Sequence, residues 1–217
     1  MNKEVRFTAA SVLFLLAALI SLGNTLLNTV RAFSLGAEAA ALSNLPAAAL
    51  AFALNMFPAT VLLARCRGIP LAVGTGLVGL LGLIRSVLSA LSMMTGYAPA
   101  VQRLLLAGVA GDVLQAMAWI LLSVLALTAR SEAGERAARR FCLLPGILYL
   151  LGLLLAVAVD AIAAYLMREG AVYLISAAFS VAFMVLPCVG MFLAGRWIPD
   201  PYKRVGDSAP AEMDELY

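Results

Sequence analysis

Long apolar stretches and short polar segments alternate along this chain of 217 residues. The apolar stretches hold roughly 20 or more residues each, which is the length that an α-helix needs to cross the hydrocarbon core of a bilayer. We therefore predict an all-α, polytopic integral membrane protein with six transmembrane helices in three hairpins. The predicted spans are residues 7–30, 45–64, 70–94, 104–129, 141–167 and 171–195. They form one membrane domain, 1–197, and the polar residues 198–217 predict a disordered tail.

The basic residues outside the spans predict how the helices are oriented. Eleven of them lie in the N-terminus, the second and fourth loops and the C-terminal tail, namely Lys3, Arg6, Arg65, Arg67, Arg130, Arg136, Arg139, Arg140, Arg196, Lys203 and Arg204. Only three lie in the other loops, namely Arg31, Arg103 and Arg168. Cytoplasmic loops carry the excess of Lys and Arg, so we predict a multi-pass protein of the plasma membrane with both termini in the cytoplasm.

The first span follows a short basic start, as the core of a signal peptide does. The small residues around Ser21 and Gly23 offer a cleavage site. The apolar stretch is longer than a typical signal core, however, and its removal would leave an odd number of spans. We therefore expect the first span to remain as an uncleaved helix.

The composition is not that of a chain that folds mainly as a soluble globular domain. Hydrophobic residues make up 64% of the chain and charged residues 12%, and the mean hydropathy is +1.00. The lipid bilayer is therefore the expected partner. A net charge of +3 does not indicate a nucleic-acid partner, because the basic residues are spread over short loops at the membrane face.

The residue types for metal-dependent and nucleophilic catalysis are sparse. The chain contains no histidine, and Cys66, Cys142 and Cys188 do not have the spacing of a metal site. We therefore expect no metal site, no cofactor and no enzymatic activity.

Three ionisable residues fall inside the predicted spans, namely Arg85, Asp112 and Asp160. A charge in hydrocarbon is costly and requires a partner or a water-filled cavity. Counted from the outer end of each helix at roughly 1.5 Å per residue, all three lie about 10–14 Å below the outer boundary of the membrane. The sequence therefore predicts a polar layer in the outer half of the bilayer.

Uncharged polar residues extend the predicted layer. Asn24 lies at a similar depth in the first span, Asn28 shares its helical face, and Asn55 comes close in the second span. Gln115 follows Asp112 by three residues, so it lies on the same face of its helix. We include these four residues with Arg85, Asp112 and Asp160 in a hypothetical ligand-binding site.

Two interpretations of this layer remain open. In the first, the polar residues line a small site that binds or transports a solute or ion, with Arg85 facing an anionic group. In the second, they are structural pairs that hold the bundle together, or join it to a partner membrane subunit, in a non-catalytic scaffold. We predict solute binding or transport, with the scaffold or complex subunit as the alternative.

Gly74, Gly76 and Gly79 match the Gly-x-Gly-x-x-Gly pattern of dinucleotide-binding proteins. That fingerprint requires a preceding strand and a following helix, whereas these glycines lie within an apolar span. We predict that they serve close packing between helices.

Overall fold

The computed structural model describes residues 3–34, 49, 52–53, 56–60, 69–93, 99–129, 132–167 and 185–196. The described residues are helical except for short turns, and none of them forms a strand. Within the helices, some side chains lie outside the description, including those of Asn24, Asn28 and Asp160. Asn55 and the tail 198–217 lie outside the described residues altogether.

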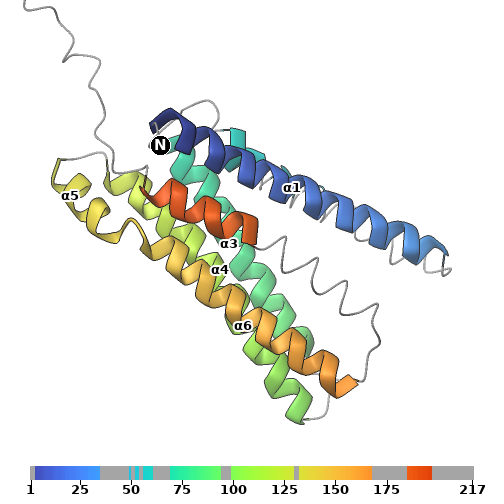
Figure 1. Ribbon diagram of the computed structural model, residues 1–217. Helices are drawn as coiled ribbons and strands as arrows, with labels where there is room; N and C mark the ends of the chain where they lie inside the picture. Colours follow the sequence, from blue (N-terminus) through green and yellow to red (C-terminus); the bar gives the residue numbers. More distant parts are fainter. Residues whose placement is uncertain are drawn as a thin grey trace, which may run out of the picture.

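Five helices are labelled in Figure 1, namely α1 (Lys3–Ser34), α3 (Ile69–Met93), α4 (Pro99–Thr128), α5 (Glu132–Phe141) and α6 (Leu144–Met167). A further apolar helix runs from Val185 to Arg196. Three stretches of the described chain are long enough and apolar enough to cross a membrane: Ile69–Leu91, Gln102–Thr128 and Arg136–Val159. The last of them includes the end of α5, the turn at Cys142 and Leu143 and most of α6. The described fold is therefore all-helical, with at least three candidate membrane-spanning segments.

The ends of these helices follow from local sequence. Helix α4 begins at Pro99 rather than near Leu104, because proline at the first helical position lacks only an N–H that would have no partner there. Helix α6 has Pro145 within its first turn, where proline is tolerated for the same reason. The turn at Cys142 and Leu143 separates α5 from α6, so the predicted span 141–167 is helical from Leu144.

Helix α4 is the centre of the bundle and packs against both α3 and α6 (Figure 1). Its apolar residues are spread around the helix, as expected for a helix that faces neighbouring helices on some sides and lipid on others. Glycine and alanine occupy the contacts with both neighbours, so the backbones approach closely. In a bilayer, where lipid tails already surround apolar side chains, such close van der Waals packing is a main source of helix association.

The three glycines of the Gly-x-Gly-x-x-Gly pattern lie in α3 and serve helix packing, as predicted. A Cβ atom on Gly74 would collide with the Phe57 ring, and one on Gly76 would lie 3.1 Å from the Ser123 hydroxyl. A Cβ atom on Gly79 would lie 2.6 Å from the Ile120 side chain. These glycines therefore give α4 and the segment 56–60 room to approach α3.

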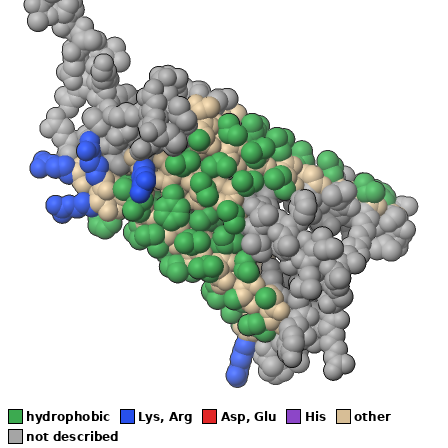
Figure 2. Space-filling model, in the orientation of Figure 1, with side chains coloured by type: hydrophobic (Ala, Val, Ile, Leu, Met, Phe, Trp, Pro, Cys, Tyr) green, Lys and Arg blue, Asp and Glu red, His purple; other side chains and the backbone are tan. Residues whose placement is uncertain are grey.

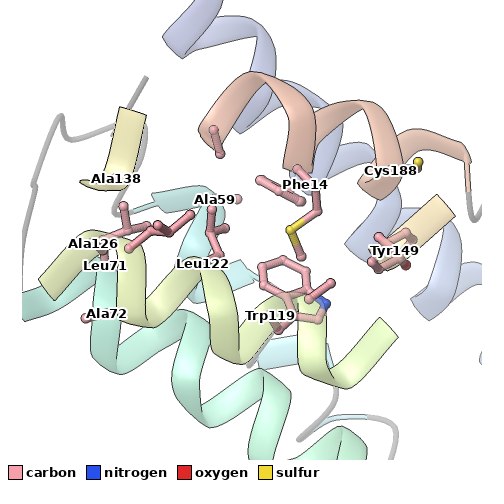
Figure 3. Packing of buried hydrophobic residues seen from close by; sticks show 14 of the residues in the cluster. Phe14, Ala59, Leu71, Ala72, Trp119, Leu122, Ala126, Ala138, Tyr149 and Cys188 are labelled. Atoms are coloured by element: carbon pink, nitrogen blue, oxygen red, sulfur yellow. The ribbon is translucent and has the colours of Figure 1, made fainter. Parts of the chain in front are cut away.

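The buried hydrophobic core lies in the part of the bundle that is nearer to α5 (Figures 1 and 3). Phe14 of α1 and Trp119 of α4 meet there with ring centroids 5.1 Å apart and planes tilted by 42°. Leu71, Leu122 and Met191 are fully buried around them. This cluster joins α1, α3, α4, α6 and the helix Val185–Arg196 into one core.

The outer surface of the helices is largely hydrophobic. Figure 2 shows hydrophobic side chains over most of the described length, with basic side chains at the ends. Large apolar residues such as Leu80, Leu88 and Leu154 are more than half exposed. A surface of this kind is compatible with lipid and not with water.

Candidate polar site between α3, α4 and α6

The packing of α3 against α4 fixes which residues of the two helices lie at the same level. Gly76 faces Ser123, Gly79 faces Ile120 and Gly82 faces Ala116. Residue numbers rise along α3 as they fall along α4, so the two helices are antiparallel. One turn beyond Gly82 and Ala116, in the direction away from α5, the next facing positions are Ser86 and Asp112.

Arg85 and Asp112 therefore lie at one level on neighbouring helices. Arg85 directly precedes the buried Ser86, and both Arg85 and Asp112 are exposed. The Ser86 hydroxyl donates a hydrogen bond of 2.9 Å to the Gly82 carbonyl of its own helix. Two opposite charges thus lie at one level of the α3–α4 contact, and the hydroxyl of the buried Ser86 at this level is already satisfied.

Asp112 is also close to α6. Gly111, the residue before Asp112, packs against Gly152 and Ala156 of α6, and Tyr149 lies one turn from Gly152 on that helix. The Asp112 side chain takes part in an interaction within the protein. Tyr149 is buried at the edge of the hydrophobic core. Asp112 is therefore exposed and at the same time lies next to the contact between α4 and α6.

Gln115 lies one turn from Asp112, where α4 and α6 make their closest approach. A Cβ atom on Gly152 would lie 2.5 Å from the Gly111 carbonyl oxygen and 2.9 Å from Cγ of Gln115. The Nε2 atom of Gln115 is buried and has no hydrogen-bond partner in the structure. An amide nitrogen carries two N–H donors, and leaving them buried without acceptors costs about 1–3 kcal/mol.

Asp160 lies further from α5 than Asp112 does. The preceding residue, Val159, packs against Gly108, because a Cβ atom on that glycine would lie 3.3 Å from Cγ1 of Val159. Gly108 is one turn from Asp112 on α4, so Asp160 is about 6 Å beyond it along the bundle. The side chain of Asp160 lies outside the description.

The structure thus brings three of the seven predicted site residues into one region, which we call the distal polar cluster: Arg85, Asp112 and Gln115. Asn24 and Asn28 belong to α1, and their side chains lie outside the description. The position of Asn55 lies outside the described residues. Whether these asparagines and Asp160 join the cluster therefore stays a prediction.

Polar side chains on the side of the bundle toward α5 have partners within the protein. The Thr75 hydroxyl donates to the Leu71 carbonyl at 2.7 Å. The Ser123 hydroxyl donates to the Ala72 carbonyl of α3 at 2.6 Å. The Ser11 hydroxyl of α1 donates to the Ala59 carbonyl at 2.6 Å. The Ser123 and Ser11 hydroxyls therefore bond between segments and the Thr75 hydroxyl bonds within α3, so the O–H donor of each is satisfied inside the protein.

Sequence reasoning missed Tyr149 and Gly152 as neighbours of the cluster. Both lie in an apolar run with no charge nearby in the sequence, so no polar pattern marks them. Their spacing with Ala156 and Val159 is that of one helical face, and all four are buried. That periodicity was the only available signal, and it indicates burial without indicating which helix supplies the contact.

Comparison with known proteins adds no family or fold relationship. No family model matches the chain, and no curated protein or solved structure does. Among the described residues, no group of three or more His, Cys, Asp or Glu side chains could hold a metal ion. The distal polar cluster therefore offers a guanidinium group, a carboxyl group and a side-chain amide, and the phenol of Tyr149 lies next to it.

Proposed function

We propose that this protein is an integral membrane protein, not an enzyme, that binds or transports a small solute through a polar site in the outer half of the bilayer. The site consists of the distal polar cluster, with Tyr149 at its inner edge and with Asp160 and the three asparagines as further expected members. The observation that carries the proposal is the buried Nε2 atom of Gln115, which has no hydrogen-bond partner in the structure.

The proposal follows from the cost of that unpaired donor. Each helix in a membrane must satisfy its polar groups internally or against a ligand or water, because lipid offers no hydrogen bonds. A solute with a hydrogen-bond acceptor would satisfy Gln115. Arg85 and Asp112, at a neighbouring level, would orient charged or polar groups of the same solute.

The membrane placement is supported by the three long apolar helices and by the distribution of arginine. Among the residues whose side chains are described, Arg136, Arg139 and Arg140 are exposed on α5, and Arg196 is exposed on the helix that packs against the turn after α5, whereas Arg103 is exposed near the start of α4. Figure 2 shows basic side chains at both ends of the bundle. We propose that the α5 end faces the cytoplasm of a cell bounded by this membrane and that the chain crosses it six times. The distal polar cluster then lies in the outer half.

A second candidate function is that of a non-catalytic membrane subunit. The observation that favours it is the exposure of Arg85 among the exposed apolar residues Ile84, Val87 and Leu88 of α3. An arginine exposed on a membrane-spanning helix is costly unless it faces water or a partner group, and an anionic partner would offset that cost. In this alternative the partner is an acidic residue on another membrane protein.

Thermal unfolding of the detergent-solubilised protein against a library of small solutes tests the first candidate. A solute present at 100 times its Kd stabilises the folded state by about 2.7 kcal/mol. We expect at least one solute to raise the Tm of the wild type and not that of Gln115→Leu. Ser123→Ala is the matched control, because it changes a polar residue of the same helix whose hydroxyl is already satisfied.

The outcomes separate the two candidates. A solute that stabilises the wild type and Gln115→Leu equally would rule out the proposed site. If no solute stabilises the wild type, and a membrane protein that copurifies with it is lost on Arg85→Gln, the subunit function is supported instead.

A further inference from the structure

Four exposed arginines form a basic patch at the α5 end of the molecule (Figure 2). We define this basic patch as Arg136, Arg139, Arg140 and Arg196. The proposed solute site does not use any of them, and they lie at the opposite side of the hydrophobic core from the distal polar cluster. Their grouping therefore requires a separate explanation.

The geometry of α5 turns its arginines away from the bundle. Ala138 is 1% exposed and belongs to the hydrophobic core. Arg136 is two residues away, which places it about 200° around the helix from Ala138. Arg140 is also two residues from Ala138, so it shares the opposite face with Arg136. Arg139 lies about 100° from Ala138, at the side of the helix, and takes part in an interaction within the protein. Ala138 thus packs α5 against the core, and the charged face of α5 is turned outward.

Arg196 joins the patch through the end of the last described helix. The preceding residue, Gly195, packs directly on the backbone of Cys142, in the turn that follows α5. Arg196 is exposed and therefore lies beside the C-terminal end of α5. Two segments that are far apart in the sequence supply cations to one surface.

The patch borders directly on apolar surface. Phe141 follows Arg140 and is 53% exposed, and Leu143, Leu144 and Ile147 continue an exposed apolar strip down α6. Cations that adjoin a strip of this kind stand at the boundary between lipid chains and water, which is the level of lipid phosphates.

We propose that the basic patch binds the headgroups of anionic phospholipids in the membrane leaflet that contacts α5. Guanidinium groups match phosphate oxygens with two parallel hydrogen bonds. The inference rests on the membrane placement proposed above but does not depend on the solute site. Lipid binding here would hold α5 against the bundle and secure the connection between α4 and α6.

Native mass spectrometry of the full chain in an equimolar mixture of phosphatidylglycerol and phosphatidylcholine with the same acyl chains tests the proposal. We expect phosphatidylglycerol to be enriched among the bound lipids of the wild type. The preference should fall about fivefold for each arginine that reaches the headgroups when Arg136, Arg139 and Arg140 are replaced by glutamine. High salt should weaken it in the wild type, because exposed charges are screened.

Two variants serve as controls. Arg103→Gln removes an exposed arginine at the opposite end of α4 and should keep the full preference for phosphatidylglycerol. Replacement of the three α5 arginines by lysine keeps the charge and should retain most of the preference, which separates lipid binding from damage to the fold. The Arg136→Gln single variant gives a second measurement should the triple glutamine variant not fold.

Three results would overturn the proposal. The first is equal binding of the two lipids by the wild type. The second is an unchanged preference in the glutamine variants. The third is displacement of phosphatidylglycerol by millimolar inorganic phosphate, which would indicate a site for a free anion. None of these results bears on whether a solute binds at Gln115, so failure of this proposal and failure of the solute site are distinguishable.

Discussion

The two halves of the helix bundle satisfy their polar groups in different ways. In the half next to α5, aromatic and aliphatic side chains interlock around Trp119, and the hydroxyls of Ser11, Thr75 and Ser123 donate to backbone carbonyls. In the distal half, the Ser86 hydroxyl also donates to a backbone carbonyl, but Arg85 and Asp112 are exposed, and Gln115 has a buried donor without an acceptor. In the first half these hydroxyl donors are satisfied within the protein, whereas in the second the amide donors of Gln115 are not.

This difference separates scaffold from candidate site on physical grounds. A polar group that is retained only for helix association should find its partner inside the protein. A polar group that is retained for a ligand has its partner only when the ligand is bound, so it costs stability in the free protein. The comparison is therefore open to test by substitutions in each half.

The largest effect is expected for Trp119→Ala, at the centre of the half next to α5. Loss of the indole would leave a cavity against Phe14 and lower the free energy of unfolding by about 3–5 kcal/mol. Thermal or denaturant unfolding in detergent measures this. Met117→Ala is the matched control, because Met117 lies on the same helix and is 47% exposed. Equal losses in both variants would contradict the position of the core.

A smaller effect is expected for Gly152→Ala, where α6 approaches α4. The added methyl group would lie 2.5 Å from the Gly111 carbonyl oxygen, and overpacking of this kind costs about 1–3 kcal/mol. We expect a lower Tm than that of the wild type. Gly23→Ala is the control, since a Cβ atom there has nothing within 4 Å. A Gly152→Ala protein as stable as the wild type would show that the helices are not in close contact at this level.

Gln115→Leu should have the opposite sign. Leucine keeps the apolar stem of the side chain and removes the unpaired donors, so the free energy of unfolding should rise by about 1 kcal/mol. The comparison of unfolding curves for the variant and the wild type, both without added solute, measures it. A loss of stability would mean that Gln115 is hydrogen-bonded within the protein. The polar groups of the distal half would then be satisfied as well as those of the half next to α5.

The smallest effect is expected for Ser123→Ala. Its hydroxyl bonds across the α3–α4 contact, and hydrogen bonds between membrane helices contribute about 0.6 kcal/mol on average. We expect a decrease of that size in the free energy of unfolding. Thr128→Ala is a suitable control, since the Thr128 hydroxyl bonds to the Leu125 carbonyl of its own helix. A larger effect for Thr128 than for Ser123 would contradict the role of the interhelical bond.

The sequence predicts the presence and type of the helices more readily than their contacts. The uninterrupted apolar runs of α3, α4 and α6 predict helices of membrane-spanning length, and the glycines of α3 predict close packing. The start of α4 at Pro99 was not predicted, because the polar and small residues before Leu104 carry no apolar signal and proline suits both a turn and a first helical turn.

The candidate site was predictable only in part. Charges in apolar spans reveal Arg85 and Asp112 because hydrocarbon makes them costly, and helical spacing adds Gln115. The neighbours of Gln115 across the helix contact, Gly152 and Tyr149, depend on how α4 and α6 are rotated and shifted relative to each other. Several rotations of an all-round apolar helix bury the same area, so composition and periodicity do not select one of them.

The approach of Gly111 to Gly152 also has a mechanical consequence. At the level of Trp119, large side chains interlock and resist any change in the angle between helices. At the glycine contact no Cβ atom fits between the two backbones, so the distance between α4 and α6 is set there by backbone atoms and not by the size of a side chain. Any residue larger than glycine at Gly111 or Gly152 would therefore act as a spacer between the two helices.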